Sequence, residues 1–178
     1  SGKSLKVDWT WNYPYSSINV TPGNGSLILT GVPYAGTKQG TVLCLRPQTT
    51  SYSYETQVGN RNGSLKGLTM YGDDRNMVAI GVQHNELIVK RVKDGRETTL
   101  SRSETESTHP FLKIKVSNGC MLTFFHSPDG KSWYRVNDTP LDGSFLVRWD
   151  RVARPGLIHR GRTNEPAVFN YFNLNHIH

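Results

Sequence analysis

The chain has 178 residues, of which 21 are Lys or Arg and 14 are Asp or Glu, so its formal net charge is +7. With 35% hydrophobic residues, 17 Gly and 9 Pro, the composition is typical of a turn-rich all-β protein, and we expect a single domain over residues 1–178. The sequence contains no apolar run of about 18 residues, which excludes a membrane-spanning helix, and no RNP, zinc-finger or helix-turn-helix signature, which argues against nucleic-acid binding.

The first segment carries a row of aromatic residues. Trp9 and Trp11 are two residues apart, which places them on one side of an extended strand, and Tyr13 continues the row. Such a row is suited to stacking against sugar rings. It is equally what an edge strand buries to close a sandwich, and this second outcome is the commoner one. A further strand is expected over residues 26–30.

Three strands follow, at residues 41–46, 52–58 and 66–71, each rich in β-branched and aromatic residues and closed by Pro, Gly or Asn. The middle strand alternates in character: Tyr52 and Tyr54 share one face, and Glu55 and Gln57 share the other. The alternation predicts a sheet with one face on an apolar core and one polar face, which meets either solvent or a polar ligand.

The rest of the chain is predicted to be a meander. We expect strands over residues 76–84, 87–92, 97–100 and 111–116, with a polar loop over residues 101–108. Residues 120–136 form a hairpin in which Ser127 and Asp129 cap the amides of the turn. Residues 141–153 are expected to be a short helix or an irregular loop, and strands over residues 156–160 and 166–174 complete the sheets.

Several of these segments together carry a family resemblance. They are Trp9-x-Trp11-Asn12-x-Pro14 and the runs TVLCLR at residues 41–46, KGLTMY at residues 66–71 and FNYF at residues 169–172. The pattern resembles the concanavalin A-like domain found C-terminal to the catalytic propeller in glycoside hydrolase family 43. The resemblance implies an all-β, two-sheet antiparallel sandwich of the jelly-roll type. It also implies a domain cut from, or associated with, a larger glycoside hydrolase.

The sequence departs from that family at two positions that bear on chemistry. The family's Gln before Arg46 is Leu45 here, and the Asp of its closing motif is Asn170. If that Asp helps to hold a calcium ion in relatives, the neutral amide of Asn170 weakens the site. We therefore expect no cofactor and no metal site, with a weakened structural calcium site as the alternative. Cys44 and Cys120 match no metal motif; they are interpreted as buried free thiols, with a single disulfide as the alternative.

Catalysis by this chain alone is not indicated. A glycosidase of this fold needs two carboxylates facing one substrate, and none of the 14 acidic residues lies in a run such as E-x-D-x-x-E. We therefore expect a non-catalytic accessory domain that binds a polysaccharide or oligosaccharide of the xylan, arabinan or galactan class, or that braces a catalytic propeller. We expect it to be secreted, periplasmic or on the cell surface. The alternatives are a free-standing glycosidase of this fold and an interaction domain that binds an acidic polymer or protein.

Candidate binding residues follow from the expected polar face. Four side chains are predicted to point into it and three aromatic or imidazole groups to rim it, which gives Arg46, Glu55, Gln57 and Tyr71 with Trp11, Trp149 and His159. The alternative for Arg46 and Glu55 is a structural ion pair. We predict no catalytic residue and no metal ligand among them.

Overall fold

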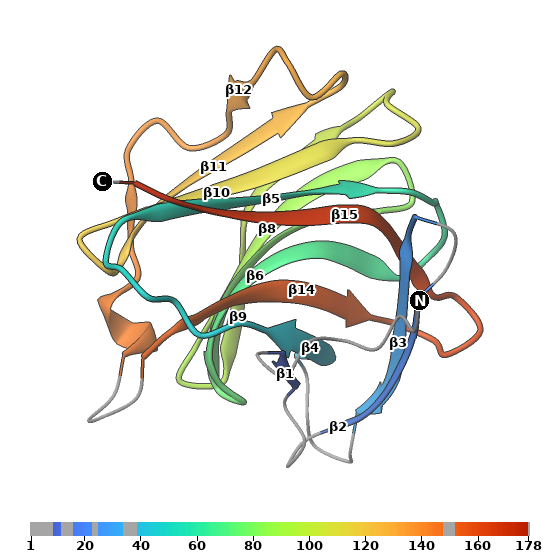
Figure 1. Cartoon of the computed structure of the whole chain (residues 1–178), viewed down its shortest axis with the longest axis horizontal. Helices are drawn as coiled ribbons and strands as arrows, with labels where there is room; N and C mark the ends of the chain where they lie inside the picture. Colours follow the sequence, from blue (N-terminus) through green and yellow to red (C-terminus); the bar gives the residue numbers. More distant parts are fainter. Residues whose placement is uncertain (1–8, 12–15, 23–24, 34–38, 148–151, 178) are drawn as a thin grey trace.

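The computed structural model describes residues 9–11, 16–22, 25–33, 39–147 and 152–177. In this part of the chain the backbone forms two antiparallel sheets packed face to face (Figure 1). The all-β, two-sheet prediction is therefore confirmed. No helix of the described residues has the length and apolar character needed to cross a membrane.

Sheet A has seven strands in the order β1-β4-β14-β6-β7-β8-β9. Their bounds are β1 Thr10–Trp11, β4 Thr41–Cys44, β14 Arg154–Arg160, β6 Leu65–Asp73, β7 Asn76–Gln83, β8 Glu86–Lys93 and β9 Arg96–Glu104. Strands β6 to β9 form a meander of three hairpins, of which β7–β8 and β8–β9 were predicted. In two of these hairpins the turn residues His84 and Asp94 have φ values of 53° and 51°, in the left-handed region that two-residue hairpin turns require.

Sheet B has eight strands: seven in the order β12-β11-β10-β5-β15-β3-β2, and β13, which pairs with β11. Their bounds are β12 Tyr134–Arg135, β11 Met121–Ser127, β10 Phe111–Ser117, β5 Tyr52–Val58, β15 Ala167–His176, β3 Leu27–Pro33, β2 Ser16–Pro22 and β13 Leu141–Asp142. The predicted turn after β11 is confirmed, since the Asp129 carboxylate accepts hydrogen bonds from the backbone N–H groups of Lys131 and Ser132, both at 2.8 Å.

The core lies between the two sheets. Along β5, burial alternates strictly, so that Tyr52 and Tyr54 face the core and Glu55 and Gln57 do not. The buried Tyr54 hydroxyl donates to the Thr69 carbonyl at 2.8 Å, which supplies its partner inside the apolar layer. The chain crosses from sheet B to sheet A between β5 and β6, so these consecutive strands face each other across the core.

Two local predictions need correction or completion. The predicted loop over residues 101–108 is wrong in its first half, because β9 continues to Glu104, which pairs with Glu86. For residues 141–153 we considered a short helix or an irregular loop. The described part of this segment contains the short strand β13 and a single 3-10 turn, η1 Ser144–Leu146. Cys44 and Cys120 are free thiols, as predicted, but only Cys44 is buried, and Cys120 is half-buried. Burial raises the pKa of the Cys44 thiol.

Candidate functional site

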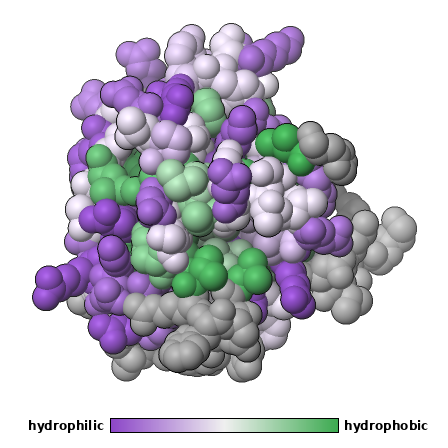
Figure 2. All heavy atoms as spheres, turned by 90° about the vertical axis from the view of Figure 1, so that its left-hand side faces the viewer, coloured by the Kyte–Doolittle hydropathy of each residue, from purple (hydrophilic) through white to green (hydrophobic). Residues whose placement is uncertain are grey.

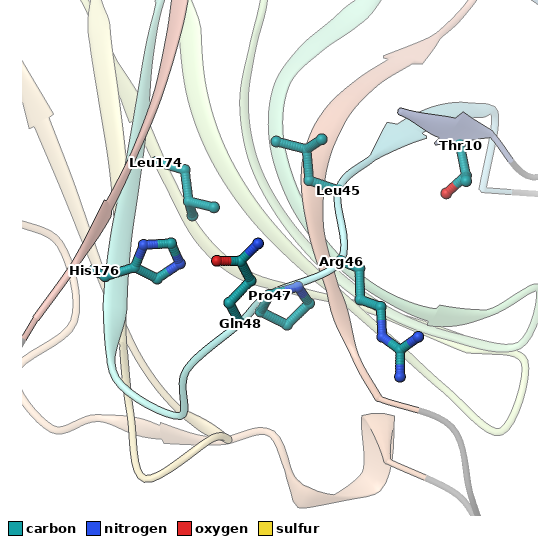
Figure 3. A pocket seen from close by; sticks show the side chains of 7 residues that line it. All are labelled: Thr10, Leu45, Arg46, Pro47, Gln48, Leu174 and His176. Carbon is teal, nitrogen blue, oxygen red and sulfur yellow. The ribbon is translucent and has the colours of Figure 1, made fainter. Parts of the chain in front are cut away.

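A pocket opens at one end of the sandwich, where the loop after β4 passes the end of β15 (Figure 3). Its volume is about 720 Å³, within the range of small-molecule sites. We call it the Arg46 pocket; it is lined by Thr10, Leu45, Arg46, Pro47, Gln48, Leu174 and His176. It therefore combines three apolar side chains with four polar side chains that are able to form hydrogen bonds.

The local sequence explains why the chain leaves the sheet here. β4 ends at Cys44, and the Leu45 N–H makes a further hydrogen bond, to the Pro155 carbonyl at 2.9 Å. Pro47 has no N–H to continue the ladder, so the backbone turns away from sheet A. On the opposite wall, Leu174 and His176 are two residues apart on β15 and project from the same face of sheet B.

One polar atom of the Arg46 pocket has no partner within the protein. The Nε2 atom of His176 is buried and has no hydrogen-bond partner. In Figure 3 the imidazole of His176 and the carboxamide of Gln48 point toward each other, while the Arg46 guanidinium extends away on the far side of Pro47. Because buried polar atoms in folded proteins almost always have a partner, the orphaned Nε2 indicates a place for a ligand or an ordered water.

Glu55 and Gln57 lie elsewhere, on the outer face of sheet B. Glu55 pairs with Lys113 of β10 at 3.2 Å and accepts a hydrogen bond from the Tyr171 hydroxyl at 3.3 Å. Gln57 accepts a hydrogen bond from the Asn170 amide at 3.0 Å and donates one to the His109 carbonyl at 3.2 Å. We call this set the Glu55 face.

Further contacts join the side chains of the Glu55 face to neighbouring aromatic rings. The Lys113 ammonium lies 3.8 Å from the centroid of the Trp133 ring, and Tyr171 also contacts the ring of Phe111 at 6.1 Å. Burial, together with the negative charge of Glu55, raises the pKa of the Tyr171 hydroxyl. Its charged groups therefore already have partners within the protein.

The prediction that Tyr71 shares a face with Glu55 is wrong. Tyr71 belongs to β6 of sheet A, whereas Glu55 belongs to β5 of sheet B. Alternation along β6 places Leu68 and Met70 in the core, so Tyr71 points to the outer face of sheet A, where it is 8% exposed. The two side chains thus lie on opposite outer faces of the molecule.

His159 does not rim an open face either. It is 1% exposed, and its Nε2 atom hydrogen-bonds to the Glu165 carbonyl at 2.8 Å. Burial lowers the pKa of the His159 imidazole, and the hydrogen bond with Glu165 opposes this effect. Trp11 is 43% exposed on the edge strand β1, while Trp9 packs edge-on against Phe172 at 5.1 Å, the sandwich-closing outcome of the two considered. Tyr13 and Trp149 lie outside the described residues.

The structure therefore brings only Arg46 of the described candidates into the Arg46 pocket, and it adds Gln48 and His176, which the sequence did not single out. His176 lies beyond the predicted strand over residues 166–174, but it is the last residue of β15 and pairs with Tyr52. The alternation of Phe172, Leu174 and His176 was the available signal, because it places the histidine on the core-facing side of its strand.

The described residues contain no group of three or more His, Cys, Asp or Glu side chains able to hold a metal ion. Two partly buried carboxylates of the described residues, Glu55 and Glu97, are far apart in the fold. Glu97 lies on the outer face of sheet A, where it pairs with Lys90 at 3.5 Å and with Arg160. Burial alone would raise the pKa of Glu97, but the hydrogen bonds and charges of Arg160 and Lys90 outweigh it and lower the pKa. Glu55 and Glu97 are on opposite sheets, so they cannot face one substrate.

Solved structures of glycoside hydrolase family 43 enzymes contain the same fold. The BlXynB protein from Bacillus licheniformis superimposes with a TM-score of 0.78 at 20% identity, covering 98% of this chain and 38% of that chain. For a xylan β-1,4-xylosidase from Bacillus halodurans C-125 the TM-score is 0.75 at 19% identity, with coverages of 98% and 38%. The chain thus spans 38% of the length of these enzymes.

A separate carbohydrate-binding module also has this architecture. CBM66 from Bacillus subtilis superimposes with a TM-score of 0.60 at 13% identity, covering 94% of this chain and 95% of that one. A comparison with curated proteins gave no match. The family described as "Beta xylosidase C-terminal Concanavalin A-like domain" matches residues 1–157. Because this match covers most of the sequence and the two-sheet sandwich agrees with it, the chain belongs to the family of β-xylosidase C-terminal concanavalin A-like domains.

Proposed function

We propose that this protein is the non-catalytic accessory domain of a secreted, periplasmic or cell-surface family 43 glycoside hydrolase. In this role it binds plant polysaccharide of the xylan, arabinan or galactan class. One observation carries the proposal: the Arg46 pocket has the volume of a ligand site and holds the buried, unpartnered Nε2 atom of His176. The similarity to CBM66 over 95% of that module's length supports a carbohydrate as the ligand.

The chemistry of the Arg46 pocket suits a neutral sugar. A pyranose presents hydroxyl groups around its edge and CH groups on its faces, so a site for it needs hydrogen-bonding groups together with apolar surface. Gln48 and His176 supply donors and acceptors, and Leu174 supplies apolar surface beside them. Arg46 is exposed and extends from the mouth of the pocket, where it can reach a neighbouring sugar unit.

The test is the affinity of the domain for neutral xylo- and arabino-oligosaccharides, measured by calorimetry or amide chemical shifts. We expect Gln48→Ala and His176→Ala each to weaken binding about tenfold, since each removes one hydrogen-bonding group from an otherwise intact pocket. Asn173→Ala is the matched control, because this exposed amide lies on the outer face of sheet B beside Glu55. Shifts that cluster on Gln57 and Asn173 instead would move the site to the Glu55 face.

A second measurement tests the non-catalytic assignment. We expect the domain to release no reducing sugar from xylan or arabinan, because its half-buried carboxylates are separated and paired with cations. Release of reducing sugar that is lost in Glu55→Ala would contradict the accessory role and support a free-standing glycosidase.

Bracing a catalytic propeller is a second candidate function, favoured by exposed apolar side chains at one end of the sandwich. Val147 and Val152 are 43% and 50% exposed, on either side of residues 148–151. Figure 2 shows hydrophobic side chains across the middle and lower part of the face that lies at the left of Figure 1, with hydrophilic ones on either side. Val147→Ser with Val152→Ser should weaken association with a separately produced family 43 propeller and leave oligosaccharide affinity unchanged. Equal association by the variant would remove this candidate.

A further inference from the structure

A second pocket lies at the end of sheet A where two hairpin turns are neighbours. The turn between β6 and β7 carries Arg75, and the turn between β8 and β9 carries Asp94 and Gly95 (Figure 1). The pocket has a volume of about 530 Å³. We call it the Arg91 pocket; it is lined by Arg75, Arg91, Lys93, Asp94, Arg96 and Thr98.

The frame of this pocket is fixed by hydrogen bonds between the two turns. The Gly95 N–H donates to the Arg75 carbonyl at 2.9 Å, and the Arg75 guanidinium donates to the Asp94 carbonyl at 2.9 Å. The Asp94 N–H also donates to the Asn76 side-chain oxygen at 3.0 Å. Arg75 is thus held at the edge of the pocket by backbone groups, and its positive charge is not cancelled by a carboxylate there.

The charges that line the Arg91 pocket are strongly unbalanced, since four cationic side chains face a single carboxylate, Asp94. Lys93 and Arg96 sit directly opposite each other across the β8–β9 ladder. Like charges in such a cross-strand pair cost stability. Within the described part of the chain neither Arg91 nor Arg96 forms an ion pair, whereas Lys93 has the negative charge of Asp142 near it, so it is the two arginines that no carboxylate neutralises.

Arg91 adds a more specific sign of a ligand. Its Nε atom is buried and has no hydrogen-bond partner. A guanidinium binds a carboxylate through two parallel N–H donors, and Nε is one of the donors used in that geometry. An oxyanion in the pocket would accept from Nε and would neutralise part of the surrounding positive charge at the same time. Lys93 is steadied by the ring of Phe145, whose centroid is 5.5 Å from its ammonium.

We infer that the Arg91 pocket binds the carboxylate of a uronic acid unit in an acidic polysaccharide. The inference rests on the proposed function only because it takes a glycan as the ligand. It adds a ligand class, acidic glycans, and a second binding site in addition to the Arg46 pocket. A volume of about 530 Å³ admits a sugar ring together with its carboxylate, whereas a water-sized group occupies only about 30 Å³. The Thr98 hydroxyl on the wall can bond to a ring hydroxyl of the same unit.

The experiment compares a xylo-oligosaccharide that carries one glucuronic acid unit with the neutral oligosaccharide of the same length. We expect the acidic compound to bind about tenfold more tightly, and we expect both Arg91→Gln and Arg96→Gln to remove this difference. Arg102→Gln is the matched control, because Arg102 is an exposed arginine of the same strand β9 but pairs with Glu86 at 2.6 Å. The control should retain the full preference for the acidic compound.

Three outcomes would overturn the inference. The first is that the acidic oligosaccharide binds no more tightly than the neutral one. The second is that Arg102→Gln weakens the binding of the acidic oligosaccharide as much as Arg96→Gln does, which would indicate general charge attraction. The third is that inorganic sulfate binds at Arg91 and Arg96 as tightly as the acidic oligosaccharide, which would indicate a small-anion site. Arg96 is exposed, so Arg96→Gln reports on binding even if Arg91→Gln fails to fold. Neutral binding that depends on His176 tests the proposed function separately, and either result can fail alone.

Discussion

The Glu55 face and the Arg46 pocket are both polar, but they differ in whether their polar groups have partners. On the Glu55 face the carboxylate pairs with Lys113 and the Gln57 amide bonds to Asn170. In the Arg46 pocket the His176 Nε2 atom is buried and unpartnered. Hydrogen-bonded polar groups stabilise the pairing of strands, whereas an unpartnered polar atom in a cavity indicates a place for a ligand or an ordered water. The type of residue therefore says less about function than the state of its hydrogen bonds.

A third region, around Lys66, contains a buried charge whose hydrogen-bond partners all belong to the protein. Lys66 is completely buried on the core side of sheet A, and its ammonium donates to the side-chain oxygen of Asn62 and, at 3.4 Å, to the Ser64 hydroxyl. Asn62 also accepts from the Ser64 N–H at 3.0 Å and donates to the Pro166 carbonyl at 2.8 Å. This Lys66 cluster belongs with the Glu55 face, since its charge is accommodated within the protein.

The largest effect is expected from Asn62→Ala. The change removes the acceptor of a buried ammonium and leaves the Pro166 carbonyl without this donor. We expect a loss of about 3 kcal/mol in the free energy of unfolding, measured by urea denaturation. Asn173→Ala, on an exposed part of β15, is the control and should change stability by about 0.5 kcal/mol or less. A small loss in Asn62→Ala would mean that Lys66 does not depend on this acceptor.

The hydrogen bonds of Lys66 offset only part of the cost of burying its charge, and the pH dependence of stability measures the remainder. Burial lowers the pKa of Lys66 to about 8, although the charge of Glu165 opposes the shift, and in the unfolded chain a lysine titrates near its ordinary value of about 10.4. Below pH 8 both states carry the proton, so the cost of burying the charge is present in full. Between these two pKa values only the unfolded state keeps its proton, so stability rises with pH.

The measurement is the free energy of unfolding of the wild type and of Lys66→Met, from pH 7 to pH 10. We expect the wild type to gain about 2 kcal/mol relative to the variant over this interval. Comparison with the methionine variant removes the contributions of other groups that titrate in the same range, including tyrosines. Parallel curves for the two proteins would contradict a lowered Lys66 pKa.

Glu55→Ala and His176→Ala together test the distinction between the structural groups of the Glu55 face and the binding groups of the Arg46 pocket. Glu55→Ala leaves Lys113 and the Tyr171 hydroxyl without their partner, so we expect a loss of about 1 kcal/mol in stability with oligosaccharide affinity unchanged. His176→Ala should show the reverse: weaker binding with little loss of stability, because its Nε2 has no partner to lose. Denaturation and calorimetry on the same two variants decide it. Two variants that lose stability and affinity together would remove the distinction.

The strands were predictable from the sequence wherever burial alternates. Residues 52–58 were predicted with the bounds of β5, because Tyr52 and Tyr54 face the core and their neighbours do not. The end of β9 was missed because nearly all of its residues are exposed, so no alternation marks the strand. Its pairing with β8, which extends to Glu104, is what makes it a strand.

The candidate site was predicted less well, for a physical reason. Residues on one strand share a face by their spacing, so Glu55 and Gln57 were placed together correctly. The assignment of Tyr71 to the same face required β5 and β6 to lie in one sheet, and local sequence does not say that the chain crosses the core between them. Pockets between loops and strand ends, such as that of Gln48 and His176, depend on such long-range packing.

The smallest expected effect concerns the Arg91 pocket, where a binding role predicts a gain in stability on mutation. Lys93 and Arg96 are opposite each other, so Arg96→Thr removes a like-charge contact and introduces a residue with high β-propensity. We expect the free energy of unfolding to rise by about 0.5 kcal/mol at low salt and the gain to shrink as salt screens the pair. Arg102→Thr should instead lower stability slightly, because Arg102 pairs with Glu86. Urea denaturation at two salt concentrations measures both. A protein that binds an anion with a cluster of cations tolerates the repulsion between those cations when the anion is absent. A loss of stability in Arg96→Thr would instead show that Arg96 has a structural partner. That result would count against the Arg91 pocket as a binding site.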